Sequence, residues 1–158
     1  MRIRSFFAIV LCFLCIMPLH VNAKQPNVIA GDIQYLSDGS YFETIITSSE
    51  IKVSSRAGTF TRSGSKTTNY KNSSGQIMWS VSVNGTYSYT VGKSSTCTSA
   101  SASASSKSSS WKVSSPSSKR SGKSATATAT GTLYMNGSVV NSYTQSVRLS
   151  CDSYGNLS

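Results

Sequence analysis

The sequence has almost no histidine and few acidic residues, and both shortages limit its chemistry. Its single histidine, His20, lies in an apolar N-terminal segment, so residues 24–158 contain no imidazole. This excludes Ser-His-Asp and Cys-His catalysis, histidine-ligated metals and a histidine pH switch from those residues. Only 5 acidic residues stand against 15 lysines and arginines. The paired carboxylates of a glycosidase, which lie about 5–10 Å apart, are therefore not expected, and we predict neither a cofactor nor a metal.

Long hydrophobic runs are missing except at the N-terminus. Residues 1–4 carry two arginines, residues 5–19 are almost entirely apolar, and small residues precede the bond after Ala23. This order is typical of a cleaved secretory signal, and the apolar run is shorter than the roughly 20 residues of a membrane-spanning helix. We predict a signal peptide over residues 1–23, a secreted protein, and no transmembrane segment in the rest; an uncleaved anchor is the alternative.

Cysteine is also scarce once the predicted signal is removed. Cys97 and Cys151 are the two that remain. In an oxidising compartment, an even pair of cysteines in a small domain usually forms a disulfide. We therefore predict one disulfide joining two sheets, with two free thiols as the alternative.

Alternating apolar and polar residues indicate β-strands, and no window shows a helical period. Residues 76–91 alternate on both sides of Asn84-Gly85, which predicts a hairpin with a three-residue loop over 83–85. The same reasoning predicts a second hairpin within residues 125–151, with a loop over 135–137 that pairs Leu133 with Val139.

Several shorter segments complete the predicted fold. Strands are expected at 44–47, 51–55, 58–62 and 110–114, and the serine-rich runs 94–110 and 114–124 are interpreted as surface strand or loop. Residues 24–42 show no clear pattern and are interpreted as an N-terminal lead-in, flexible in the simplest case. We predict an all-β fold, a single antiparallel β-sandwich over residues 43–158.

Two resemblances support this interpretation. The order Cys97, Trp111, Cys151 resembles immunoglobulin-like sandwiches, which would imply a Trp packed on an inter-sheet disulfide, although Leu149 stands where that family has a tyrosine. The stretches 63–90, 121–131 and 149–158 resemble small, uncharacterised secreted β-domain proteins of Gram-positive bacteria. That resemblance covers about residues 63–158 and implies secretion and a β-domain, but no catalytic or binding residue.

The distribution of charge is the clearest functional signal. Residues 51–150 contain no acidic residue and 12 lysines and arginines. The densest group comprises Lys107, Lys112, Lys119, Arg120 and Lys123. A surface with this imbalance attracts polyanions within about a Debye length. We predict that these five residues bind an anionic envelope polymer such as teichoic acid; the alternative is that they only keep the protein soluble.

Together these features predict a secreted, non-catalytic binding protein that uses a basic Ser/Thr-rich surface. We expect it either to be released or to associate loosely with the cell wall. Ser-x-x-Lys matches such as those at Ser63 and Ser109 occur at about the frequency that this composition produces by chance. The alternatives are an antibacterial protein or inhibitor that acts by occlusion, and a structural subunit of a surface or matrix. An unknown protein partner is compatible with each of them.

Overall fold

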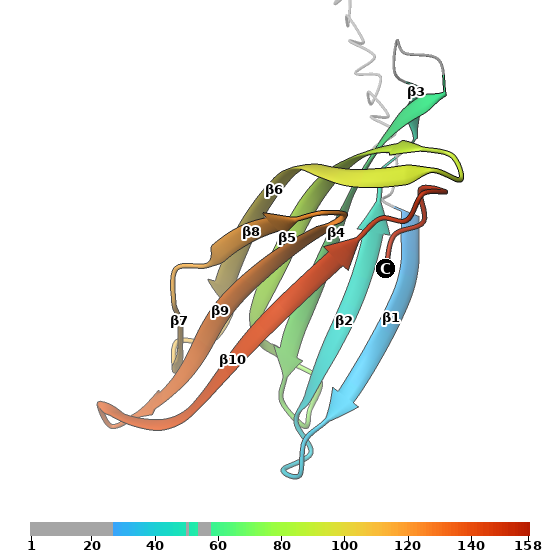
Figure 1. Ribbon diagram of the computed structural model, residues 1–158. Helices are drawn as coiled ribbons and strands as arrows, with labels where there is room; N and C mark the ends of the chain where they lie inside the picture. Colours follow the sequence, from blue (N-terminus) through green and yellow to red (C-terminus); the bar gives the residue numbers. More distant parts are fainter. Residues whose placement is uncertain (1–26, 50, 54–57) are drawn as a thin grey trace, which may run out of the picture.

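The structure, a computed structural model, describes residues 27–49, 51–53 and 58–158, and every regular element in them is a β-strand (Figure 1). The predicted signal peptide lies outside these residues. The large sheet comprises β1 (Asn27–Tyr35), β2 (Tyr41–Ser48), β3 (Lys52–Val53), β4 (Thr59–Lys71), β5 (Ile77–Thr90) and β6 (Ser94–Ser106). The small sheet comprises β7 (Trp111–Val113), β8 (Ser117–Ser121), β9 (Ser124–Met135) and β10 (Ser138–Ser150). All strand pairs are antiparallel, so the predicted all-β, antiparallel class is confirmed. No helix in the described residues is long and apolar enough to cross a membrane.

The strand order differs from the immunoglobulin arrangement. The large sheet is a meander in the order β1-β2-β4-β5-β6, with β3 paired to β4, whereas immunoglobulin sandwiches use Greek-key connections. In the small sheet, β10 pairs with one side of β9, and β7 and β8 both pair with the other side. Trp111 packs among aromatic rings, with centroids 4.9 Å from Tyr70 and 6.4 Å from Trp79, instead of on a disulfide.

The two sheets are joined on one side and separated on the other. On the β6/β8 side, the Cys97 amide donates to the Gly122 carbonyl at 2.8 Å, and the Arg120 guanidinium donates to the Thr98 carbonyl. On the opposite side, β1 and β10 are the last strands of their sheets among the described residues (Figure 1). The sandwich therefore has one closed side and one side with two free edges.

The hairpin predicted at Asn84-Gly85 is wrong. Residues 77–90 form one continuous strand, β5, which pairs with β4 and β6 along its length. The alternation of buried and outward residues runs without a break through Asn84-Gly85, so an extended chain satisfies it as well as a hairpin does. Gly85 is needed in this strand because the Tyr87 ring folds over it, where a Cβ atom would overlap the ring.

The second predicted hairpin is confirmed, with a different register. β9 and β10 are joined by a two-residue turn, in which Asn136 and Gly137 have φ of 51° and 79°. Positive φ at both positions is typical of a type I′ turn. A bulge follows between Val139 and Asn141, so Leu133 pairs with Asn141 instead of Val139. The predicted three-residue loop becomes a tight turn followed by a bulge.

The serine-rich run and most of the lead-in are also strands. In β6, Ala100, Ala102 and Ala104 face the inner layer, and the intervening serines are exposed. The part of the predicted lead-in that the structure describes contains β1 and the start of β2, which pair with each other. Three predicted short strands, 44–47, 58–62 and 110–114, overlap β2, β4 and β7, and residues 52–53 of the fourth form β3.

The core fills the layer between β2 and β4–β6 of the large sheet and the small sheet. Trp79, Tyr87, Val81 and Leu149 are fully buried there. The Trp79 indole lies against the backbone of Gly131 in β9, where a Cβ atom would overlap the ring. Large rings on the large sheet thus face small residues on β9, which is the complementarity that a packed layer requires.

The predicted disulfide is wrong, because Cys97 and Cys151 are both free and buried. Tyr87 lies near both cysteines. It pairs with Cys97 across β5 and β6, and its hydroxyl crosses the layer to donate to the Leu149 carbonyl at 2.7 Å. Its ring therefore occupies the space between the sheets beside both cysteines.

Each thiol is instead directed at a carbonyl of its own segment. The Cys97 Sγ lies 3.2 Å from the Ser99 carbonyl oxygen, and the Cys151 Sγ lies 3.5 Å from that of Asp152. Burial raises the pKa of both thiols. The two cysteines therefore behave as core residues, and they are poor nucleophiles at neutral pH.

Candidate functional site

The outer face of the small sheet is formed by the alternating residues of β9. Ala125, Ala127 and Ala129 are buried beneath the sheet, facing the rings of the core. The residues between them are threonines, which project from the opposite face and are half-buried. The strand has this pattern because small side chains are needed inside, while β-branched threonines favour the extended backbone and tolerate water.

Hydroxyl pairs cross this face from β9 to β10. Thr128 and Ser146 lie 3.1 Å apart, Thr130 and Thr144 lie 2.8 Å apart, and a third pair, Thr132 and Ser142, lies 3.3 Å apart. Such cross-strand pairs each contribute about 0.2–1 kcal/mol to a sheet. The hydroxyls therefore stabilise the sheet and also make its outer face uniformly polar.

Cations stand beside this hydroxyl ladder. Lys119 of β8 and Arg148 of β10 oppose Thr126 from its two sides, so the three residues form one row across the sheet. Neighbouring strands are about 4.8 Å apart, which places the two cationic residues about 10 Å apart at their Cα atoms. Lys112 of β7 opposes Thr132, about 20 Å further along β9 at about 3.3 Å per residue.

The cations on this face have polar or aromatic neighbours and no carboxylate. Arg148 donates to the Ser124 hydroxyl at 2.8 Å, which fixes one end of its guanidinium. Lys112 Nζ lies 5.1 Å from the centroid of the Tyr134 ring. Within the described residues, neither of these side chains nor Lys119 makes an ion pair. Their charge is therefore available to an anionic ligand.

The five residues predicted to bind a polyanion do not form one cluster. Lys112 and Lys119 lie on the outer face, at opposite ends of β9. Lys123 lies in the β8–β9 turn, and its charge helps to lower the pKa of Asp152. Burial raises the pKa of the Asp152 carboxyl, but hydrogen bonds from Asn156 and from the Tyr154 amide lower it further, so the net shift is downward.

The other two predicted residues have different surroundings. Arg120 reaches across the closed side of the sandwich and donates to the Thr98 carbonyl of β6, so it connects the two sheets. Lys107 follows β6, and its amide donates to the Met78 carbonyl at the start of β5. This places Lys107 at the end of the sandwich away from Lys119.

Sequence reasoning missed Arg148, which stands apart from the other cations along the chain. The signal that could have identified it is the alternation of β10. Val147 and Leu149 are buried, so the residue between them must project from the outer face, where the β9 threonines also lie. We define the basic face by the residues Lys112, Lys119, Arg148 and the four threonines Thr126, Thr128, Thr130 and Thr132.

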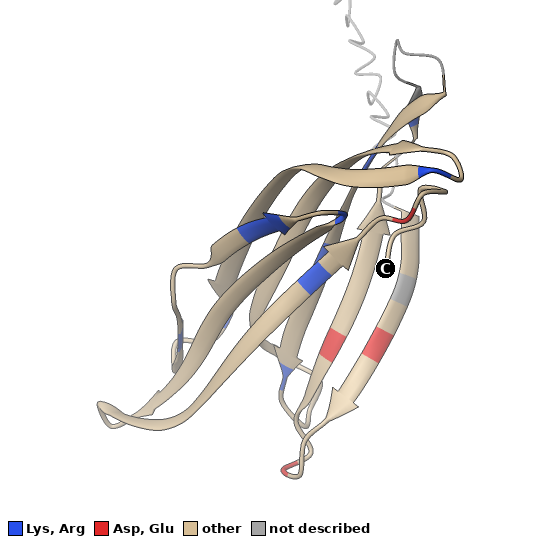
Figure 2. Ribbon diagram, in the orientation of Figure 1, with Lys and Arg blue, Asp and Glu red and all other residues tan. Residues whose placement is uncertain are grey.

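The acidic residues lie mostly on the other side of the molecule. Figure 2 shows blue positions on β8 and β10, and red positions on β1, on β2 and in the connection between those two strands. The acidic residues there are Asp32, Asp38 and Glu43. Glu43 accepts an ion pair from Lys71 at 2.7 Å, which also raises the pKa of that lysine. The molecule is therefore electrically asymmetric, with its basic face remote from most described carboxylates.

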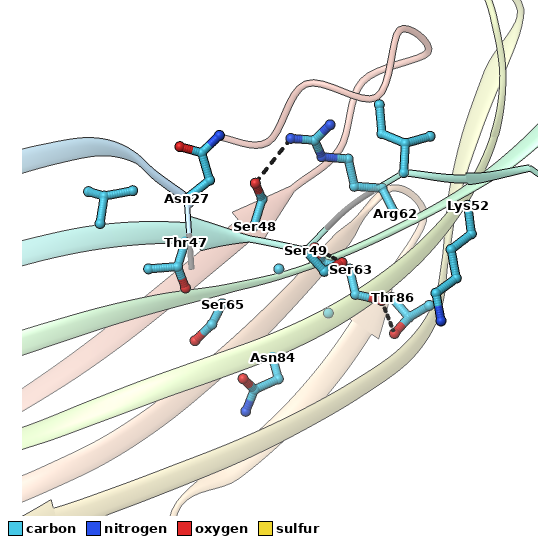
Figure 3. Close-up of a pocket in the computed structure, with 14 residues that line it drawn as sticks. Asn27, Thr47, Ser48, Ser49, Lys52, Arg62, Ser63, Ser65, Asn84 and Thr86 are labelled. Atoms are coloured by element: carbon cyan, nitrogen blue, oxygen red, sulfur yellow. Dashed lines mark hydrogen bonds between the residues drawn. The ribbon is translucent and has the colours of Figure 1, made fainter. Parts of the chain in front are cut away.

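A polar hollow lies on the outer face of the large sheet. Figure 3 shows Thr47, Ser65 and Asn84 directed to one side of the sheet, while Arg62 and Ser48 are directed to the other. Arg62 donates to the Ser48 hydroxyl at 3.1 Å. The hydroxyls on the outer side bond to one another, as Ser63 and Thr86 do at 3.0 Å. Like the outer face of the small sheet, this hollow is lined by paired hydroxyls, but it has fewer cations.

Among the described residues, neither the basic face nor the hollow on the large sheet has a group of side chains suited to bind a metal ion. In the parts of the chain that are described, no three His, Cys, Asp or Glu residues lie close enough together to hold a metal ion. The basic face offers a ligand charge attraction from its cations and hydrogen bonds from its hydroxyls. No protein-family model, curated protein or solved structure matches this chain.

Proposed function

We propose that the protein is a secreted, non-catalytic binding protein whose basic face holds an anionic polymer of the cell envelope. The observation that carries the proposal is the row Lys119–Thr126–Arg148, two cations on either side of a hydroxyl with no ion pair to a described carboxylate. An extended face suits a polymer better than a small molecule, because the cations are spread along β9.

The chemistry of the face favours phosphate groups. Arg148 offers planar guanidinium donors, of which the Ser124 hydroxyl accepts one, and Lys119 adds a mobile point charge. The threonine hydroxyls can donate to phosphate oxygens between the cations. A polymer of repeating phosphodiesters, such as teichoic acid, presents regularly spaced charges and hydroxyls of its own. Such binding needs no enclosed pocket and no fixed register along the polymer.

Retention on isolated Gram-positive cell walls tests the proposal. Walls with and without teichoic acid are incubated with the purified protein from about 50 to 500 mM salt, a range over which exposed charges become screened. We expect retention that requires teichoic acid and decreases as salt increases. Retention that is independent of teichoic acid, or none at the lowest salt concentration, would contradict the proposal.

A further inference from the structure

The first strand has its polarity reversed relative to the rest of the sandwich. Ile33 and Tyr35 of β1 project from the outer face of the large sheet and are 48% and 70% exposed. Asp32 and Gln34, by contrast, project from the face that carries the core residues of the neighbouring strands. Val28 is also exposed. An apolar outer surface on a strand suggests that something other than the small sheet covers it.

The same strand offers a free edge. β1 is nine residues long and pairs only with β2 among the described strands. It contains neither lysine nor proline, two residues that commonly prevent edge strands from pairing, and its bulge between Val28 and Ala30 lies before the stretch Gly31–Tyr35. Its backbone donors and acceptors on the free side are therefore able to accept another extended strand.

We propose that a second copy of this chain pairs with β1, the two β1 strands running antiparallel about a two-fold axis beside Ile33. The two large sheets would then form one continuous sheet. Symmetric pairing of identical surfaces gives a closed dimer, and main-chain hydrogen bonds between edge strands supply much of its affinity. This proposal is independent of the proposed function.

The sequence of β1 is self-complementary about that axis. Ile33 meets Ile33 of the second copy, so apolar side chains meet on the outer face. Asp32 meets Gln34, whose amide can donate to the carboxylate, so two carboxylates are not opposed. Tyr35 meets Gly31, which leaves room for its ring. Rings already lie over glycines elsewhere in this protein, as with Tyr87 and Gly85.

The charge distribution favours the same contact. The protein has a formal net charge of +10, so two copies repel each other over most of their surfaces. Most of its acidic residues lie at the β1–β2 end, where Glu43 is paired with Lys71. Two basic molecules therefore meet there with least repulsion. The basic faces lie on the small sheets and would stay accessible, so a dimer would present two of them.

Sedimentation of the purified protein from about 1 to 500 µM, a range that covers ordinary homodimer affinities, tests the proposal. We expect a monomer–dimer equilibrium that Ile33→Lys abolishes, because a charged side chain on the edge opposes pairing. Val140→Lys is the matched control, since Val140 is 56% exposed and belongs to the other free edge, β10. A wild-type monomer throughout, or a dimer that Val140→Lys disrupts and Ile33→Lys does not, would overturn the proposal.

Two substitutions of Gln34 test the register without changing the core. Gln34→Asp places two carboxylates opposite each other at both Asp32 pairs, and we expect at least a tenfold weaker dimer. Gln34→Arg places a guanidinium opposite each Asp32, and we expect a tighter dimer. Thermal unfolding of dilute monomer confirms that each variant folds. Equal effects of the two substitutions would contradict pairing about Ile33.

Discussion

The two outer faces of the sandwich are built alike and charged differently. On the large sheet, Thr67 and Ser82 bond at 2.7 Å, and Ser63 and Thr86 bond at 3.0 Å. On the small sheet, Thr130 and Thr144 bond in the same way at 2.8 Å. Hydroxyl ladders therefore belong to the fold and do not by themselves identify a binding surface.

What differs is the set of charges beside the ladders. The small sheet adds Lys112, Lys119 and Arg148 to its outer face, with no carboxylate paired to them among the described residues. The outer face of the large sheet has Glu43 paired with Lys71 near one end, and Lys52 at its hollow. The comparison teaches that charge, rather than serine and threonine content, distinguishes the candidate site, and it makes the large sheet an internal control.

Reversing the charge of two cations on the small sheet should have the largest effect on polymer binding. Lys119→Glu/Arg148→Glu is expected to weaken binding of a phosphodiester polymer on the order of 100-fold at low salt, because two contacts become repulsive. The matched control, Lys52→Glu/Lys93→Glu, makes the same change in net charge with exposed residues elsewhere. Equal losses in the two variants, measured by titration at fixed salt, would mean that only net charge matters.

Adding one methyl group beneath the small sheet should destabilise the protein. Gly131→Ala places a Cβ atom in the Trp79 ring, and overpacking of this kind costs about 1–3 kcal/mol. Gly31→Ala, compared on dilute monomeric protein, is the control, because a Cβ atom there would lie 3.6 Å from the Thr44 carbonyl oxygen, an ordinary contact. Chemical denaturation measures both variants. Similar midpoints for the two would contradict the packing described for Trp79.

The layer between the faces should lose stability at high pH. Burial raises the pKa of the Cys97 and Cys151 thiols above their ordinary value of 9.0. Above that pH the unfolded chain releases these protons first, so unfolding becomes easier, whereas below it the thiols have no such effect. We expect a flat unfolding temperature up to about pH 9 and a decline above it. The decline should be shallower in Cys97→Ala/Cys151→Ala; an equally steep decline would assign it to other groups.

Removing a single hydroxyl should have the smallest effect on stability, and the effect should be equal on the two faces. Thr130→Val and Thr67→Val each remove one cross-strand hydrogen bond while keeping the side-chain shape. Each is expected to change the free energy of unfolding by about 0.5 kcal/mol or less. Thr130→Val is expected to weaken polymer binding only slightly, because the cations supply most of the attraction, and Thr67→Val is expected to leave it unchanged. A clear loss of affinity from Thr130→Val alone would show that the hydroxyls themselves recognise the ligand.

Most strands could be predicted from alternation, but which Asn-Gly dipeptide forms a turn could not. Asn84-Gly85 and Asn136-Gly137 are the same dipeptide in similar surroundings, yet only the second is a turn. Alternation continues unbroken through the first, whereas the adjacent Val139 and Val140 interrupt it after the second. The decisive contact at Gly85 is the Tyr87 ring, and the direction in which a ring folds is not visible in the sequence.

The site was predicted only in part, for a similar reason. Lys112 and Lys119 were found because they lie in a basic stretch of the chain, whereas Arg148 joins them only through strand pairing. Arg120 lies next to Lys119 in the chain but contacts the other sheet, because successive residues of a strand face opposite sides. Closeness along the chain therefore included Lys107, Arg120 and Lys123, which lie off the basic face, and missed Arg148.

Mapping a polyanion onto the two faces tests the central claim most directly. Amide chemical shifts of the isotope-labelled protein are followed during titration with a soluble phosphodiester polymer, first at low salt and then with salt added. We expect changes concentrated at Lys119, Thr126 and Arg148 that disappear as salt screens the charges, with little change at Ser65 and Asn84 on the large sheet. Changes centred on the large sheet, or spread evenly over both faces, would contradict a binding site on the small sheet.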